Sequence, residues 1–90
     1  MSGAGLSSVE KVECFLNDKQ TTDIEIKLML HRNINNKHCF TVELKRNGSR
    51  TGSVSKYFDY EDESKARKLF VSFTDFKTAN NYINKSMKEE

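Results

Sequence analysis

The sequence predicts an α+β fold: a three-stranded antiparallel sheet with helices packed on one face. Two segments alternate strictly between apolar and polar residues, an Asn-Gly turn signal follows the second, and helical apolar spacing appears on either side of them. The expected order is α-β-β-β-α-α. A chain of 90 residues forms one small domain. We expect this domain over residues 6–87, with a disordered tail at 1–5 and a charged tail at 88–90.

Alternation marks the first two expected strands, Asp23–Leu30 and Cys39–Lys45. Each has apolar residues at every second position, which is typical of a strand with one buried face. These apolar positions are Ile24, Ile26, Leu28, Leu30, Phe40, Val42 and Leu44. The Asn-rich loop Arg32–Lys37 predicts that the two strands form an antiparallel hairpin. Keeping the apolar faces together, we expect Leu28 opposite Phe40, with the neighbouring pairs in step.

The Asn47-Gly48 pair predicts a second hairpin. A two-residue turn at this pair sends Val54 and Phe58 to the solvent face, so the pattern argues against it. A three-residue loop with the glycine in the left-handed conformation keeps both residues on the buried side. We therefore expect this loop, which pairs Lys45 with Ser49.

Helical spacing predicts three helices outside the sheet. A capping box, Ser7 with Glu10, precedes an apolar stripe and predicts a first helix that ends near Asn17. After the sheet, Asp62 is the expected N-cap of a second helix and Asp75 that of a third. The three apolar stripes are Val9, Val12 and Leu16; then Ala66, Leu69, Phe70 and Phe73; then Phe76, Ala79, Ile83 and Met87.

Composition argues against several functions. No apolar run approaches the ~20 residues of a membrane span, and the N-terminus lacks signal-peptide features, so we expect a cytoplasmic protein without a membrane partner. The two cysteines, Cys14 and Cys39, make no disulfide framework, and with the histidines they lack zinc-site spacing. The hairpin could bring His31 near Cys39, but no oxyanion-hole motif accompanies the pair. We expect no metal, no cofactor and no catalytic residue, hence no enzyme.

Charge is unevenly distributed along the chain, although the net charge is only +2. From Ile24 to Tyr57 there are seven basic and two acidic residues, and the stretch Asp59–Glu63 is acidic. The basic stretch coincides with the expected sheet. A basic sheet with an exposed Tyr57 could contact phosphates and stack on a base. Its lysines would equally suit a solvated face that resists aggregation.

Three function hypotheses follow. The first is a small protein-binding module, an inhibitor or regulator of a larger partner, which uses the open sheet face or a strand edge. The alternative is a nucleic-acid-binding domain that uses the same sheet. Self-association through the sheet face or an edge strand is the third. The candidate partner-binding residues are Lys27, Thr41, Lys45, Arg46, Arg50, Ser53, Ser55 and Tyr57.

Three resemblances bear on these hypotheses. Phe40–Leu44, Gly52 and Glu63–Lys68 resemble the double-stranded-RNA-binding domain, which implies RNA binding. That family's lysine-rich motif directly follows a glycine turn, whereas the acidic Tyr57–Asp62 intervenes in this chain. Three strands followed by a helix are similar to the arm-type DNA-binding domains of phage integrases, which implies DNA binding by the sheet. The α-β-β-β-α-α order is also similar to small phage inhibitors of bacterial defence systems, which implies a protein partner.

Overall fold

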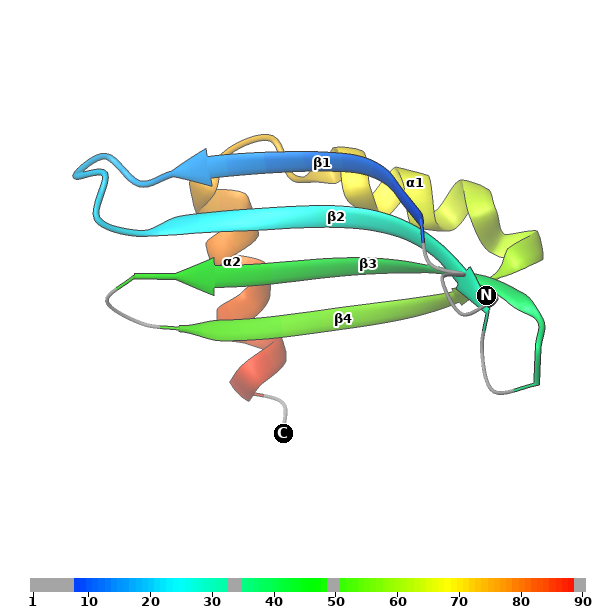
Figure 1. Ribbon diagram of the computed structural model, residues 1–90. Helices are drawn as coiled ribbons and strands as arrows, with labels where there is room; N and C mark the ends of the chain where they lie inside the picture. The colour runs from blue at the N-terminus through cyan, green and yellow to red at the C-terminus, as the bar shows by residue number, and fades with distance from the viewer. Residues whose placement is uncertain (1–7, 33–34, 49–50, 89–90) are drawn as a thin grey trace, which may run out of the picture.

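The computed structural model describes residues 8–32, 35–48 and 51–88. It is a small α+β fold with an antiparallel sheet and two helices (Figure 1). Four strands lie side by side in chain order, β1 (Ser8–Leu16), β2 (Asp23–Arg32), β3 (His38–Asn47) and β4 (Gly52–Asp59). They are followed by the 3-10 turn η1 (Tyr60–Asp62), α1 (Glu63–Ser72) and α2 (Phe76–Lys88).

Both helices lie on one face of the sheet, here named the inner face (Figure 1). The opposite face is named the outer face. Within the described ranges, neither helix has the length and apolar character needed to cross a bilayer. The expected tails fall on residues 1–5 and 88–90, of which only Lys88 is described, as the last residue of α2.

The first element of the described residues is a strand, so the predicted first helix is wrong and the sheet in this part of the chain has four strands. Ser7 of the expected capping box lies outside the described residues. β1 pairs antiparallel with β2, and the register shifts between Val9 and Lys11 because Glu10 is an extra, bulged residue. The bulge puts Val9 and Val12 on one face three positions apart, which imitates helical spacing. The resemblances that need a leading helix therefore lose their basis.

The faces of the central strands agree with the alternation pattern, but both registers differ from the prediction. Leu28 lies opposite Val42, two positions from the expected Phe40, because β2 continues to Arg32 and the hairpin loop is shorter. Lys45 lies opposite Ser53, four positions from the expected Ser49. Both shifts are even numbers of residues. An even shift leaves every side chain on its face, so the apolar pattern cannot detect it.

The core lies between the inner face and the two helices. The apolar stripes predicted for α1 and α2 supply buried side chains to it, and α2 begins directly after Asp75 as expected. Asp75 caps α2, since its Oδ1 accepts the Thr78 backbone N–H at 2.9 Å. The buried cluster comprises Ile24, Ile26, Leu28, Phe40, Val42, Leu44, Ala66, Phe70, Phe73, Ala79 and Ile83.

A buried arginine joins the sheet to α2. Arg46 is 4% exposed, and its Nη1 donates to Oδ1 of Asn80 at 2.6 Å and to Oδ1 of Asn84 at 2.8 Å. Gly52 lies opposite Arg46 on β4, and a Cβ there would stand 3.1 Å from Sδ of Met87. The missing side chain lets the last turns of α2 approach the sheet at this point.

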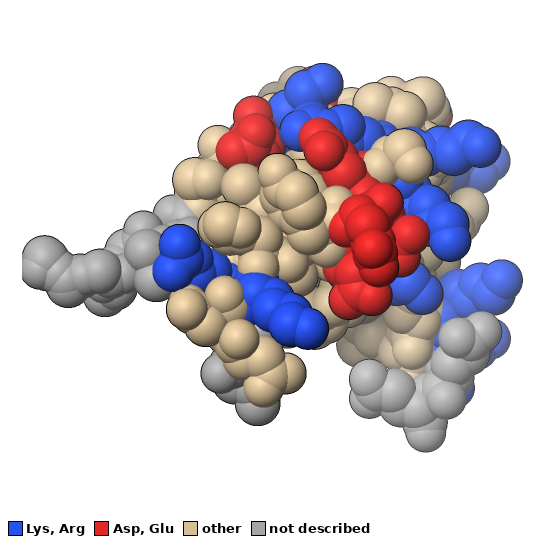
Figure 2. All heavy atoms as spheres, turned by 90° about the vertical axis from the view of Figure 1, so that its right-hand side faces the viewer, with Lys and Arg blue, Asp and Glu red and all other residues tan. Residues whose placement is uncertain are grey.

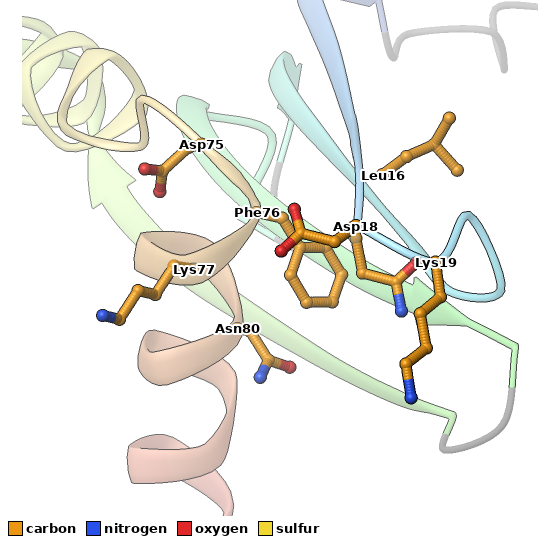
Figure 3. Close-up of a pocket in the computed structure, with 8 residues that line it drawn as sticks. Leu16, Asp18, Lys19, Asp75, Phe76, Lys77 and Asn80 are labelled. Atoms are coloured by element: carbon orange, nitrogen blue, oxygen red, sulfur yellow. The ribbon is translucent and has the colours of Figure 1, made fainter.

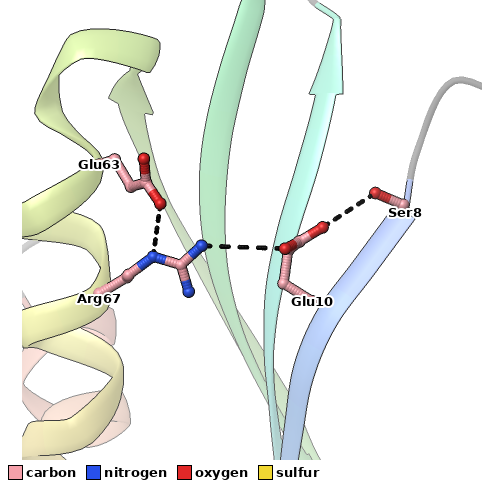
Figure 4. Close-up of polar contacts among 4 residues, drawn as sticks. All are labelled: Ser8, Glu10, Glu63 and Arg67. Carbon is pink, nitrogen blue, oxygen red and sulfur yellow. Dashed lines mark hydrogen bonds and ion pairs between the residues drawn. The ribbon is translucent and has the colours of Figure 1, made fainter.

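A second arginine joins β1 to α1 (Figure 4). Arg67 donates from Nε to Glu63 Oε2 at 2.6 Å, and its Nη2 lies 3.8 Å from Glu10 Oε1. Glu10 also accepts the Ser8 hydroxyl at 3.3 Å. The bulge is what turns the Glu10 side chain toward α1, so the irregularity in β1 provides a contact to the helix layer.

Candidate functional site

The outer face is the largest part of the sheet that neither helix covers (Figure 1). Four large side chains are about half exposed or more on this face: Val9 at 51%, Val12 at 49%, Leu16 at 57% and Tyr57 at 68%. The first three come from the edge strand β1, and Tyr57 comes from the opposite edge, on β4. An apolar side chain that remains in water contributes little to folding, so these four are available for contacts with another molecule.

The centre of the outer face is a quartet of alternating charges: Glu25, Lys27, Glu43 and Lys45. Lys27 lies opposite Glu43 and Glu25 lies opposite Lys45 in the pairing of β2 with β3. Lys27 Nζ is also 3.6 Å from Glu25 Oε1. Each carboxylate therefore has a lysine neighbour, and the quartet is neutral as a group.

The predicted partner-binding residues do not all share one face. Those that lie on the outer face are Lys27, Thr41, Lys45, Ser53, Ser55 and Tyr57. Arg46 is buried on the inner face, and Arg50 lies outside the described residues. Lys56, one of the basic residues of the stretch, lies opposite Val42 on the inner side.

The outer face is consequently not basic. Among the described residues, its two lysines stand against four carboxylates, Asp23, Glu25, Glu43 and Asp59, so its formal net charge is −2. The basic stretch seen in the sequence is divided between the two faces because consecutive residues of a strand point in opposite directions.

A polar cluster at one end of the outer face joins three strands. His31 lies in β2, beyond the expected strand end at Leu30, and its Nε2 is hydrogen-bonded to Thr41 Oγ1. The Cys39 sulfur is 3.5 Å from the same nitrogen. The Tyr57 ring meets the imidazole edge-on, with 6.3 Å between ring centroids. Thr41 and Cys39 are 3% and 7% exposed, so His31 and Tyr57 form the surface above them.

The Cys39–His31 contact does not produce an activated nucleophile. Burial, and secondly the Asp59 carboxylate, raise the pKa of the Cys39 thiol above its usual 9.0. The neutral thiol therefore predominates at neutral pH, and the thiolate is the nucleophilic form. Within the part of the chain that the structure describes, no three His, Cys, Asp or Glu side chains are placed to hold a metal ion.

Sequence reasoning missed the exposed apolar residues of β1 because it assigned them to the core side of a helix. The available signal was that Val12, Cys14 and Leu16 occupy every second position, as on one face of a strand. Cys14 lies between the other two on the outer face, with its sulfur 3.9 Å from Asp23 Oδ2. Desolvation first, and then the carboxylates of Asp23 and Glu25, raise the pKa of its thiol.

A hollow of about 650 Å³ lies where the β1–β2 turn meets the start of α2 (Figure 3). Phe76 is placed between Asp18 and Lys19 of the turn on one side and the N-cap Asp75 and Lys77 of α2 on the other. The hollow carries both signs of charge, and the Asp75 carboxylate already caps α2. It therefore shows no preference for an anion or a cation.

Acidic side chains gather at the opposite end of the molecule, with basic side chains on both sides of them (Figure 2). Glu61 and Asp62 of η1 and Glu63 of α1 belong to this end. A second hollow, of about 470 Å³, lies beside them between the β2–β3 hairpin and Tyr60. Negative charge at this position complements the dipole of α1, which is a structural role.

No protein-family model, no curated protein and no solved structure matches the chain.

Proposed function

We propose that the chain is a small, non-enzymatic protein-binding module, an inhibitor or regulator of a larger partner, which it contacts through the outer face. One observation carries the proposal: the two helices cover only the inner face, and the outer face keeps Val9, Val12, Leu16 and Tyr57 in solvent. Exposed apolar side chains rimmed by polar ones are characteristic of protein interaction surfaces.

The charge arrangement on the outer face favours a protein as the partner. The quartet of Glu25, Lys27, Glu43 and Lys45 alternates in sign, so a complementary surface must alternate as well. Protein surfaces provide both signs at short spacing, and such complementarity fixes register and specificity. Tyr57 adds a large aromatic contact, and tyrosine is enriched among the residues that dominate binding energy.

The alternative, nucleic-acid binding through the same sheet, has weaker support. The outer face carries a formal charge of −2 among the described residues, whereas affinity for phosphates comes from clustered Lys and Arg. Arg46 is committed to Asn80 and Asn84 of α2. Tyr57 could still stack on a base, but stacking alone is not selective for nucleic acid over protein.

The test compares an outer-face variant with a matched variant on the helix side. Tyr57→Ala with Lys45→Ala removes one exposed ring and one charge from the outer face. Val71→Ala with Lys68→Ala removes an exposed apolar residue and a lysine from α1, where Val71 is 60% exposed. Each protein, immobilised through a C-terminal tag, is used to capture partners from a lysate of the source cells, with thermal unfolding by circular dichroism as the folding control.

We expect a protein retained by the wild type and by the α1 variant to be lost from the outer-face variant. Equal retention by all three contradicts the proposal. Fluorescence anisotropy with duplex DNA, single-stranded DNA and duplex RNA at two salt concentrations tests the alternative. Tight, salt-sensitive binding that the outer-face variant loses favours nucleic acid, because phosphate contacts release counterions.

A further inference from the structure

β1 is an edge strand of the sheet. β1 pairs with β2 on one side, and in the described part of the chain no strand pairs with its other side. It is a nine-residue strand, and nearly all of its side chains are exposed. Backbone N–H and C=O groups along such an edge can pair with a further strand, so a long uncovered edge is a docking surface.

The charges of β1 identify the strand that fits this edge. Glu10, Lys11 and Glu13 carry all the charge of β1 and point toward the inner side. Glu10 is held by Arg67. Lys11 and Glu13 are exposed, and neither forms an ion pair within the described ranges. Lys11 and Glu13 lie one residue before and one residue after Val12, and their charges are opposite. Two antiparallel copies of β1 can therefore place each lysine opposite a glutamate.

We propose that β1 pairs antiparallel with β1 of a second copy of this chain, centred on Val12. In this register Lys11 lies opposite Glu13 of the partner subunit, and the two-fold axis repeats the pair with the roles exchanged. Val12 meets the partner subunit's Val12 on the outer face. Oppositely charged and β-branched cross-strand pairs are both favourable in antiparallel sheets.

The bulge at Glu10 extends this match. If Glu10 is left out of the new pairing, as it is against β2, Cys14 lies opposite Val9 of the partner subunit on the outer face. The exposed apolar side chains of both copies then form one continuous strip. The two four-stranded sheets join into a single eight-stranded sheet with all helices on one side. The interface is isologous, as a two-fold dimer requires.

An alternative antiparallel register is centred on Cys14, two residues further along β1. This register brings the two Cys14 thiols face to face and leaves Lys11 opposite Asn17 of the partner subunit, without a charge pair. The register centred on Val12 keeps the two Cys14 Cα atoms roughly 13 Å apart, given the rise per residue of a strand. Disulfides need Cα atoms less than about 7 Å apart, so Cys14 should not cross-link the dimer.

Charge reversal tests the proposal on the full chain. Sedimentation equilibrium measures the dimer dissociation constant of the wild type, Lys11→Glu, Glu13→Lys and the double variant. Each single variant places two like-charged pairs at the interface, so we expect its dissociation constant to rise about tenfold or more. The double variant restores both pairs and the dimer. An equimolar mixture of the two single variants, each mainly monomeric, should also form dimers.

Lys68→Glu on α1 is the matched control and should leave the dissociation constant unchanged; circular dichroism confirms that every variant folds. Three outcomes overturn the proposal: a wild type that stays monomeric at about millimolar concentration, a dimer that survives both reversals, and a Cys14 disulfide-linked dimer under mild oxidation. The test of the dimer is independent of the test of the proposed function. Tyr57→Ala with Lys45→Ala alters the outer face, whereas Lys11 and Glu13, on which the dimer depends, stay in place.

Discussion

The two faces of the sheet both carry large apolar residues, but the exposure of these residues differs. Leu44 on the inner face is 0% exposed, whereas Leu16 on the outer face is 57% exposed. Both are leucines on strands of one sheet, and only the inner one lies under the helices. The comparison shows that these two leucines differ in helix coverage and not in apolar character. The buried side chains of the inner face therefore hold the fold, and the exposed apolar side chains of the outer face remain available to a partner.

The largest expected effect on stability comes from truncating the two leucines of this comparison. Leu44→Ala should lower the free energy of unfolding by about 2–5 kcal/mol, because it removes a buried side chain and leaves a cavity. Leu16→Ala should change it by less than about 0.5 kcal/mol, as is usual for exposed positions. Urea unfolding followed by circular dichroism measures both values. Equal losses in the two variants would mean that the outer face is covered in solution.

Neighbouring residues of β3 give a second, smaller contrast. Arg46→Met should lower the free energy of unfolding by about 2–3 kcal/mol, because Asn80 and Asn84 lose a charged donor. Lys45→Met on the outer face should stay within about 0.5 kcal/mol of the wild type. The same urea titration applies. An Arg46→Met protein as stable as the wild type would show that this buried arginine can be replaced by packing alone.

The smallest effect is a change in how stability depends on pH in the acid range, and it concerns the helix side. The Thr78 backbone N–H first, and then the Thr78 hydroxyl, hold the pKa of Asp75 below its usual 3.8. The folded pKa is the lower one, so the Asp75 carboxylate stabilises the fold above the usual pKa. This stabilisation is lost as the pH falls through the folded value.

Asp75→Asn should therefore weaken the dependence of stability on pH in the acid range and have its largest effect near neutral pH. Urea midpoints measured from neutral pH to below 3.8 provide the check. Thr78→Val keeps the backbone donor and removes the hydroxyl, so it should fall between Asp75→Asn and the wild type. Parallel pH profiles for Asp75→Asn and the wild type would show that the charge of Asp75 does not contribute to stability.

Alternation and helical spacing were sufficient to predict the α+β class, the faces of β2 and β3, and the two helices after the sheet. They failed at β1, where Glu10 adds one residue to a period of two and so mimics a helix. They also failed at the registers, because an even shift preserves every face. The apolar pattern specifies which side of a strand is buried, while loop geometry specifies which residues meet.

The candidate site was predictable in part for the same reason. Tyr57, Ser55 and Ser53 follow the alternation of β4 and were placed on the correct side. Arg46 was offered as a binding residue although it continues the inner series of Val42 and Leu44 by one step. The charge of Arg46 favours an exposed side chain, whereas its place in the strand alternation favours a buried one. The side chain is buried because two asparagines of α2 accept hydrogen bonds from the guanidinium.

The attachment of β1 has a consequence for how the molecule opens. β1 is held by the hydrogen-bond ladder to β2, by the partly buried Phe15 and by the Glu10–Arg67 contact. The other strands and both helices share a core that does not need it. In the monomer, we expect β1 to detach in local unfolding events that leave the remainder intact, so its amide hydrogens should exchange with solvent sooner than those of β3. Equal protection in hydrogen-exchange measurements would instead show that the whole domain opens as one cooperative unit.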